Sequence, residues 1–205
     1  MTKKRFGFWQ PLLCIGLIVV LATGMCRFSA RCERIRTSVL RLHILANSDS
    51  DEDQALKLQV RDRLLEESAE LFESVQNETE AADAARAHIG LLQDIAEAEI
   101  EQCGYAYPVT IEVGPAHFDT RNYEDVTLPA GDYTAVRVLI GEAAGKNWWC
   151  VMFPAMCLPA ASEQKELSEV LNDEELDIVS NRPQYEVRFK IVEVYESLKN
   201  RLKKQ

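Results

Sequence analysis

The sequence predicts an α+β fold, a single domain in which helices pack on a mostly antiparallel sheet and which follows an N-terminal signal or anchor helix. Three observations carry this prediction. One long uncharged run lies near the N-terminus, at residues 6–26. Segments with alternating apolar residues recur along the rest of the chain, and two long segments between them have the apolar spacing of helices. We therefore expect a signal peptide or membrane anchor at residues 1–26 and one domain over residues 27–205.

The N-terminal segment has the order of parts found in a secretory signal. A basic start is followed by the apolar run of residues 12–23, and the small residues Ala22 and Gly24 have the −3 and −1 spacing of a cleavage site. The uncharged run is also long enough to cross about 30 Å of hydrocarbon as a retained helix. Cleavage and retention both stay open. Both predict that the rest of the chain is exported, with membrane contact through residues 6–26 if the leader is retained.

The domain is expected to begin with a strand that is followed directly by a helix. Residues 38–46 carry leucine and isoleucine at alternating positions, with the period of a strand. The polar run of residues 47–50 stops this strand. An apolar stripe with helical spacing then predicts a helix over about residues 51–75.

A second helix is expected at residues 79–102, because its alanines and leucines share one face and a glycine follows its end. Further strands are expected at residues 107–113, 122–128, 132–140 and 148–153. The middle two of these strands are expected to pair as a hairpin around Pro129-Ala130-Gly131, which has the composition of a tight turn.

The C-terminal part of the chain is predicted to contain three different segments. Residues 158–182 are acidic and only weakly periodic, so we expect a surface helix or a linker there. Alternation at Val187, Phe189 and Ile191 predicts a closing strand. A final helix is expected from about Tyr195, with basic residues at its C-terminal end.

Composition and charge exclude several classes of protein. Apolar residues make up 47% of the chain and charged residues 27%, which are ordinary values for a chain that buries a core. A polytopic membrane protein is excluded because only one long apolar run exists. The net charge of −10 disfavours non-specific adhesion to nucleic acid or to an anionic lipid surface, so no nucleic-acid partner is expected.

The acidic run of residues 47–53 has only a superficial likeness to a calcium loop. The positions at which an EF-hand needs glycine and glutamate carry other residues here. Helix capping is the favoured interpretation, either by Asp49 with Glu52 or by Ser50 with Asp53, since an acid three residues after the cap is typical of helix starts.

Candidate catalytic chemistry is sparse. His43 precedes Ser48 and Asp49 closely, and these are the residue types of a serine nucleophile with its base, but no nucleophile-elbow motif accompanies them. Three histidines without an H-E-x-x-H motif disfavour a zinc hydrolase. The glycine-flanked run of residues 141–146 lacks the spacing of a phosphate loop and predicts a plain turn. We expect no metal, no cofactor and no catalysis.

Cys150 and Cys157 are the most informative cysteines. They flank a short segment, and in an exported protein such a pair forms a disulfide worth about 2.5 kcal/mol in the chain-entropy model. Two buried thiols are the alternative. Trp148 and Trp149 lie directly before the pair and either cover the bond or anchor a partner, because aromatic residues are enriched among interface anchors.

Three segments of the domain are distinctive as motifs: residues 40–62 (LRLHILANSDSDEDQALKLQVRD), 128–157 (LPAGDYTAVRVLIGEAAGKNWWCVMFPAMC) and 185–197 (YEVRFKIVEVYES). Together they resemble the stage II sporulation protein R family, and the R-L-H-x-x-A-N-S-D run and the W-W-C run are the most specific. The resemblance covers essentially the whole domain. Its departures from the family pattern are confined to Leu128, Asp132 and Ala155.

This resemblance implies a signalling role in endospore-forming bacteria. It implies a protein made in the forespore and exported to the space between forespore and mother cell, either secreted or membrane-anchored. There the family's protein activates a membrane-bound aspartic protease, stage II sporulation protein GA, which processes pro-sigma-E. A signal of this kind needs a recognition surface and no catalysis of its own.

Two candidate receptor-binding surfaces follow. The first is the polar face of the first strand with the cap and helix after it: Arg41, His43, Asn47, Ser48, Asp49, Asp53, Gln54, Lys57 and Arg61. The second is the pair Trp148 and Trp149. Each has a structural alternative, a salt-bridged strand–helix junction for the first and core packing for the second. The runner-up function is an exported cell-wall or peptide hydrolase that uses His43 with Asp49, and a membrane-tethered structural module is the third.

Overall fold

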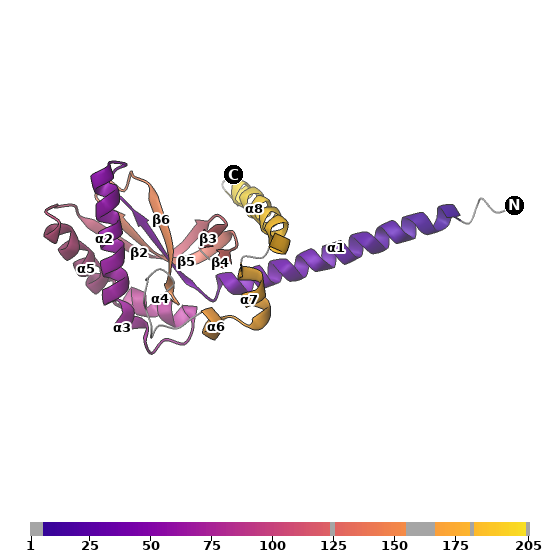
Figure 1. The fold of residues 1–205 in the computed structure, drawn as a ribbon, viewed down its shortest axis with the longest axis horizontal. Helices are drawn as coiled ribbons and strands as arrows, with labels where there is room; N and C mark the ends of the chain where they lie inside the picture. Colours follow the sequence, from indigo (N-terminus) through magenta and orange to yellow (C-terminus); the bar gives the residue numbers. More distant parts are fainter. Residues whose placement is uncertain (1–5, 124–125, 155–166, 181–182, 204–205) are drawn as a thin grey trace.

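The computed structural model has the mixed α+β architecture expected from the sequence (Figure 1). It describes residues 6–123, 126–154, 167–180 and 183–203. A long helix, α1 (Phe6–Arg36), projects from a domain built on a four-stranded sheet. From Pro11 onward, α1 is long and apolar enough to cross a membrane, and most of that length is exposed. The expected N-terminal signal or anchor helix is therefore present as a helix.

Four strands form the main sheet in the order β2-β5-β1-β6. They are β1 (Leu40–Leu45), β2 (Val109–Phe118), β5 (Gly131–Ile140) and β6 (Asn147–Phe153). Strand β1 pairs parallel with β5 and antiparallel with β6, while β2 pairs antiparallel with β5. The mostly antiparallel sheet is thus confirmed. A separate two-stranded ribbon joins β3 (Arg121–Tyr123) to β4 (Val126–Leu128).

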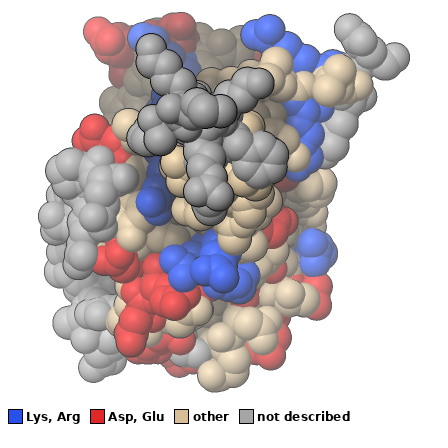
Figure 2. All heavy atoms as spheres, turned by 90° about the vertical axis from the view of Figure 1, so that its right-hand side faces the viewer, with Lys and Arg blue, Asp and Glu red and all other residues tan. Residues whose placement is uncertain are grey.

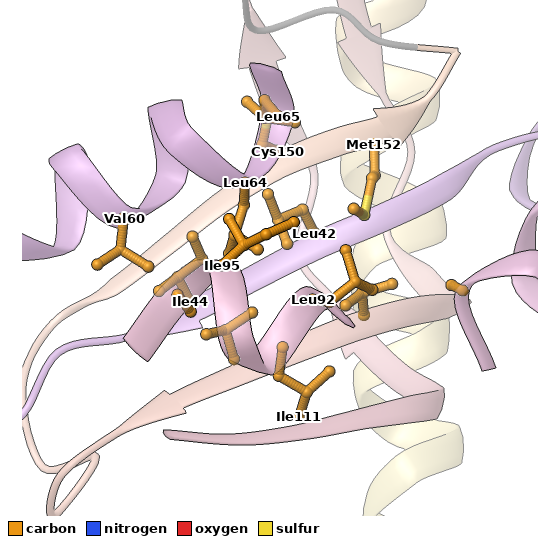
Figure 3. Close-up of a cluster of buried hydrophobic side chains, with 14 of the residues drawn as sticks. Leu42, Ile44, Val60, Leu64, Leu65, Leu92, Ile95, Ile111, Cys150 and Met152 are labelled. Atoms are coloured by element: carbon orange, nitrogen blue, oxygen red, sulfur yellow. The ribbon is translucent and has the colours of Figure 1, made fainter. Parts of the chain in front are cut away.

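Helices cover one face of the sheet and enclose the larger core with it (Figure 3). They are α2 (Asp51–Glu67), α3 (Ala69–Phe72), α4 (Glu78–Ala87) and α5 (Ile89–Gln102). Leu42 and Ile44 of β1 share this core with Val60 and Leu64 of α2 and with Leu92 of α5. Each such side chain contributes about 2 kcal/mol by leaving water, so apolar packing holds this face together.

The opposite face of the sheet carries a second core. Its helices are α6 (Leu167–Val170), α7 (Asp173–Val179), α8 (Pro183–Lys203) and the last turns of α1. Phe28 and Ile35 of α1 are buried here with Phe118 of β2 and Tyr133 of β5. The acidic segment of residues 158–182, expected as a surface helix or linker, contributes α6 and α7, and its residues 158–166 and 181–182 lie outside the described part of the chain.

The predicted hairpin of residues 122–128 with 132–140 is wrong. Strand β4 pairs with β3, whereas β5 pairs along its length with β2 and lies beside β1 inside the sheet. The reason is that β5 is apolar on both faces: Tyr133 lies in the second core and Val138 in the first. A strand buried on both faces needs long partners on both edges, which the three-residue β4 does not provide.

The predicted closing strand at Val187, Phe189 and Ile191 is also wrong, because these residues belong to a single helix, α8. Two apolar stripes interleave on this helix. Tyr185 and Phe189 are buried in the second core, while Val187 and Ile191 are exposed on another face. Apolar residues from the two stripes fall at alternate positions along the chain, and this imitates the period of a strand.

The two long predicted helices are each divided. The helix expected at residues 51–75 ends at Glu67, after which α3 adds one further turn. The helix expected at residues 79–102 is interrupted at His88, which is exposed and lies between α4 and α5. Both divisions let the helical layer bend over the sheet and cover it.

Candidate functional site

The turn between β1 and α2 is organised around one buried carboxylate, that of Asp53. Its Oδ2 accepts hydrogen bonds from Asn47 Nδ2 at 2.9 Å and from Ser48 Oγ at 2.5 Å. The backbone N–H of Asp53 donates to Ser50 Oγ at 3.2 Å, which makes Ser50 the N-cap of α2. Burial opposes ionisation of Asp53, but hydrogen bonds from Ser48, Asn47 and Tyr107 outweigh it and lower the pKa of this carboxyl.

The loop after β5 is fastened to the same turn. Asn47 Oδ1 accepts from the backbone N–H of Glu142 at 3.0 Å, and Asp49 Oδ1 accepts from that of Lys146 at 2.7 Å. The fit is close, because a Cβ on Gly145 would lie 2.1 Å from the carbonyl oxygen of Ser48. We call residues 47–54 and 141–147 together the junction. The loop was expected as a plain turn, and sequence reasoning missed its contact with the β1–α2 turn.

Lys57 and Gln54 brace the junction from α2. Lys57 Nζ donates to Gln54 Oε1 at 2.6 Å and to the carbonyl of Lys146 at 2.9 Å, while Gln54 Nε2 donates to the carbonyl of Ser48 at 2.8 Å. Burial lowers the pKa of Lys57. Most of the polar atoms predicted as a recognition surface are therefore used to hold the shape of the junction. In the described ranges, no group of three or more acidic, histidine or cysteine side chains could hold a metal ion.

Arg41 lies on the other face of the sheet from the junction's helix. Its side chain is fully buried, with the guanidinium carbon 4.2 Å from the centre of the Phe118 ring and 4.9 Å from that of Tyr133. Nε donates to the carbonyl of Cys150 at 2.8 Å, and Nη2 donates to the hydroxyl of Tyr123 at 2.6 Å. Its Nη1 has no hydrogen-bond partner among the residues that the structure describes. Arg41 is thus part of the second core.

His43 lies beside Arg41 on that same face. Its ring stacks on Trp149 with 3.8 Å between centroids, and Nε2 hydrogen-bonds Asn147 Oδ1 at 2.7 Å. Burial lowers the pKa of His43, so the neutral imidazole is favoured. The hydroxyl of Ser48 donates to Asp53 instead. The candidate nucleophile and its candidate base therefore have different partners and do not form a triad.

The two tryptophans separate to opposite faces of β6, as adjacent strand residues must. Trp149 packs in the second core, whereas Trp148 packs on the first core and lies under Arg61, whose guanidinium carbon is 4.6 Å from the ring. Both rings are half-buried. Arg61 and Trp148 thus adjoin the junction and extend its surface along α2.

Cys150 is buried in the first core and is disulfide-bonded. Cys157 lies outside the described residues, so its pairing with Cys150 stays a prediction. The Arg41 guanidinium reaches the Cys150 carbonyl, and this links the second core to the strand that carries the bond.

The exposed candidate site is accordingly smaller than the predicted one. The junction presents Asp49, Glu142 and Lys146 to solvent, with Trp148 and Arg61 half-exposed beside them. The buried network beneath fixes their positions. Arg41 and His43 do not belong to this surface, and the glycines at 141 and 145 were the sequence signal that the loop makes a close contact.

A family model described as stage II sporulation protein R matches residues 36–163 of the chain, from the end of α1 through the whole main sheet. The stage II sporulation protein R of Bacillus subtilis strain 168 is 33% identical over 135 residues. The alignment covers 66% of this chain and 60% of that relative, which is less than two thirds of the relative's length. No solved structure matches this chain.

Proposed function

Because this chain belongs to the stage II sporulation protein R family and acts in sporulation, we propose that it is an exported signalling protein. Its receptor is a membrane-bound aspartic protease, stage II sporulation protein GA. Binding activates that protease, which then processes pro-sigma-E across the space between forespore and mother cell. The chain itself supplies recognition and no catalytic group.

The observation that carries this proposal is the rigid junction. Asp53 and Lys57 are buried, and half-buried side chains around them form hydrogen bonds with both. The exposed rim is therefore fixed before any partner arrives. A preorganised surface loses less conformational entropy on binding than a flexible one. Trp148 and Arg61 are of the residue types that most often anchor interfaces.

Activation by such a ligand requires a difference in affinity. A protein that binds the active state of the protease better than its inactive state shifts the population toward activity, and equal affinity for both states would shift nothing. The junction acts as the element that discriminates between the two states. Export is supported by α1, which is apolar enough to serve as a signal or an anchor.

Reconstitution tests this proposal. The full chain is co-expressed with the protease and a pro-sigma-E reporter, and each component is then omitted in turn. Processing is expected only when all three are present. Processing that continues without this chain would sink the proposal.

Variants locate the surface within that assay. Lys146→Glu reverses an exposed charge on the junction, and Arg61→Ala removes the cation over Trp148. Both are expected to abolish processing while thermal unfolding stays close to that of the parent. Arg63→Ala is the matched control, because Arg63 lies on the same helix, is exposed and pairs only with the neighbouring Glu67 among the described residues. Equal processing by all three variants would place recognition elsewhere.

A further inference from the structure

Helix α8 has two apolar faces. One packs in the second core through Tyr185, Phe189 and Val192, together with the buried carboxylate of Glu196. The other, which we call the outer stripe, consists of Val187, Ile191, Val194, Tyr195, Leu198 and Leu202. These six follow the i, i+4, i+7, i+8, i+11, i+15 spacing of one helix face. Their exposed fractions run from 48% to 74%, so no described segment covers them.

A continuous exposed stripe of this length marks a contact surface, because single exposed apolar residues are normal on a soluble protein but a contiguous patch is not. The stripe lies on the face of α8 that the domain does not use. Something other than the described part of this chain therefore covers it.

The position of α8 relative to α1 points to what covers it. The Phe28 ring of α1 stacks on Tyr185 at 6.0 Å and meets the edge of Phe189 at 5.6 Å. Phe28 is four residues beyond Gly24, near the end of the exposed apolar part of α1, so it lies about 6 Å further along the helix axis. The headgroup layer of a bilayer is about 7 Å thick on each side. A bilayer crossed by α1 thus has its headgroups at the level where α8 begins.

The direction of α8 fits the same surface. In Figure 1, α8 begins beside the domain part of α1 and runs away from it at a steep angle instead of continuing its direction. A helix at a steep angle to a membrane-spanning helix at this level runs along the bilayer surface. Figure 2 looks at the molecule from the side on which α1 projects, and it shows basic side chains on this side of the domain among acidic and uncharged ones.

Charge favours an anionic lipid surface. Helix α8 carries five basic and three acidic residues, although the whole chain has a net charge of −10. One of the three acids, Glu196, is buried beside Arg36 at 3.7 Å and does not face solvent. Arg201 lies in the last turns of α8 next to the outer stripe and is exposed. The net charge of the chain disfavours adhesion of the domain as a whole, whereas this helix has the opposite sign.

We propose that the outer stripe of α8 lies on the surface of an anionic phospholipid bilayer, next to the point where α1 enters it. Amphipathic helices with apolar residues on one face and basic residues beside it bind membranes in this way. This contact requires only that α8 lies beside α1 with its outer stripe exposed and its basic residues next to it. It holds on either side of the membrane and is independent of the proposed receptor, so the two proposals fail separately.

Depth-dependent quenching tests the proposal in the full chain. The chain, in a Trp9→Phe background, is reconstituted into vesicles of phosphatidylglycerol and brominated phosphatidylcholine. Leu198→Trp reports on the outer stripe, and Leu91→Trp is the matched control, because Leu91 is an equally apolar, 45% exposed residue on α5. The Trp9→Phe parent keeps Trp148 and Trp149, so its emission is subtracted from that of each variant. The emission that Leu198→Trp adds is expected to lose most of its intensity relative to vesicles without bromine, while the emission that Leu91→Trp adds keeps its intensity.

Two further measurements test whether charge contributes to the lipid contact and whether the stripe instead binds a second copy of the chain. Adding Arg201→Glu to L198W, or replacing phosphatidylglycerol by phosphatidylcholine, is expected to restore part of the emission. Equal quenching of L198W and L91W would overturn the proposal. Unquenched L198W together with a dimer that Leu198→Glu dissociates, measured by sedimentation in detergent, would assign the stripe to a second copy of the chain instead.

Discussion

The two faces of the sheet are built by different chemistry. On the face that α2 covers, the core is apolar, and Leu42 and Ile44 are completely buried. On the other face the same strand buries Arg41 and His43 among aromatic rings. Arg41 is as fully buried as Leu42, so burial alone does not separate a charged core residue from an apolar one. The comparison teaches that a polar strand face in the sequence need not be a solvent-facing surface.

On the face of the sheet that α2 covers, removing side-chain volume should lower the free energy of unfolding most. Leu64→Ala is expected to lower the free energy of unfolding by about 3 kcal/mol, because it removes transfer free energy and leaves a cavity. Urea denaturation followed by circular dichroism measures this loss. Leu91→Ala is the exposed control and should cost well under about 1 kcal/mol. Equal losses for the two variants would contradict an apolar core on this face.

The second face can be probed by separating volume from charge. Arg41→Ala is expected to cost about 3 kcal/mol, because it opens a cavity between the rings and leaves the Cys150 carbonyl without its donor. Arg41→Met lacks the same donor but fills the space without a charge, so it should cost only about 1 kcal/mol. A methionine variant as unstable as the alanine variant would show that the charge itself holds this face together.

The junction should respond to pH through Asp53. Asp53→Asn is expected to cost about 2 kcal/mol at neutral pH, because its amide cannot accept all of the hydrogen bonds that now converge there. The folded pKa of Asp53 lies below its ordinary value of 3.8, so its contribution is complete above pH 3.8 and is lost as pH falls through the folded pKa. The difference in the free energy of unfolding between the parent and Asp53→Asn, measured by urea denaturation, should therefore narrow below that pH. Asp51→Asn, in the same helical turn, is the control for the loss of one exposed carboxylate.

A smaller effect is expected from His43. Its folded pKa lies below the ordinary value of 6.5, so the unfolded chain binds a proton more readily. Stability is therefore full above pH 6.5 and falls as pH drops from there toward the folded pKa. His43→Gln should flatten this slope in thermal unfolding measured across that range, and His88→Gln serves as the control for removal of an imidazole. An unchanged slope in H43Q would assign the pH dependence to another group.

Secondary structure and pairing could be predicted from the sequence where the apolar residues follow a single period. They were predicted wrongly where apolar residues of two faces overlap along the chain. The strand at Leu42 and Ile44, the helix after it and the Ser50 cap followed from local pattern. Strand β5 was assigned the wrong partner because both of its faces are apolar and its true neighbours come from distant segments. The glycines at 141 and 145 indicate that the loop makes a close contact, but they do not name Asn47 as the partner, since a contact across about a hundred residues has no period.

Helix α1 is continuous, and this determines how far from a bilayer the junction is held. Its last turns are buried with Phe28 and Ile35 in the domain, so no hinge separates the apolar segment from the folded part. Figure 1 shows α2 at the end of the molecule opposite the N-terminus, and the junction lies at the start of α2. A chain held by α1 in one bilayer would carry the junction outward at a constant height, facing an apposed bilayer rather than its own. Under the proposed function, such a chain would hold the junction at a fixed distance from its own bilayer, and a cut after Gly24 would release a diffusible domain.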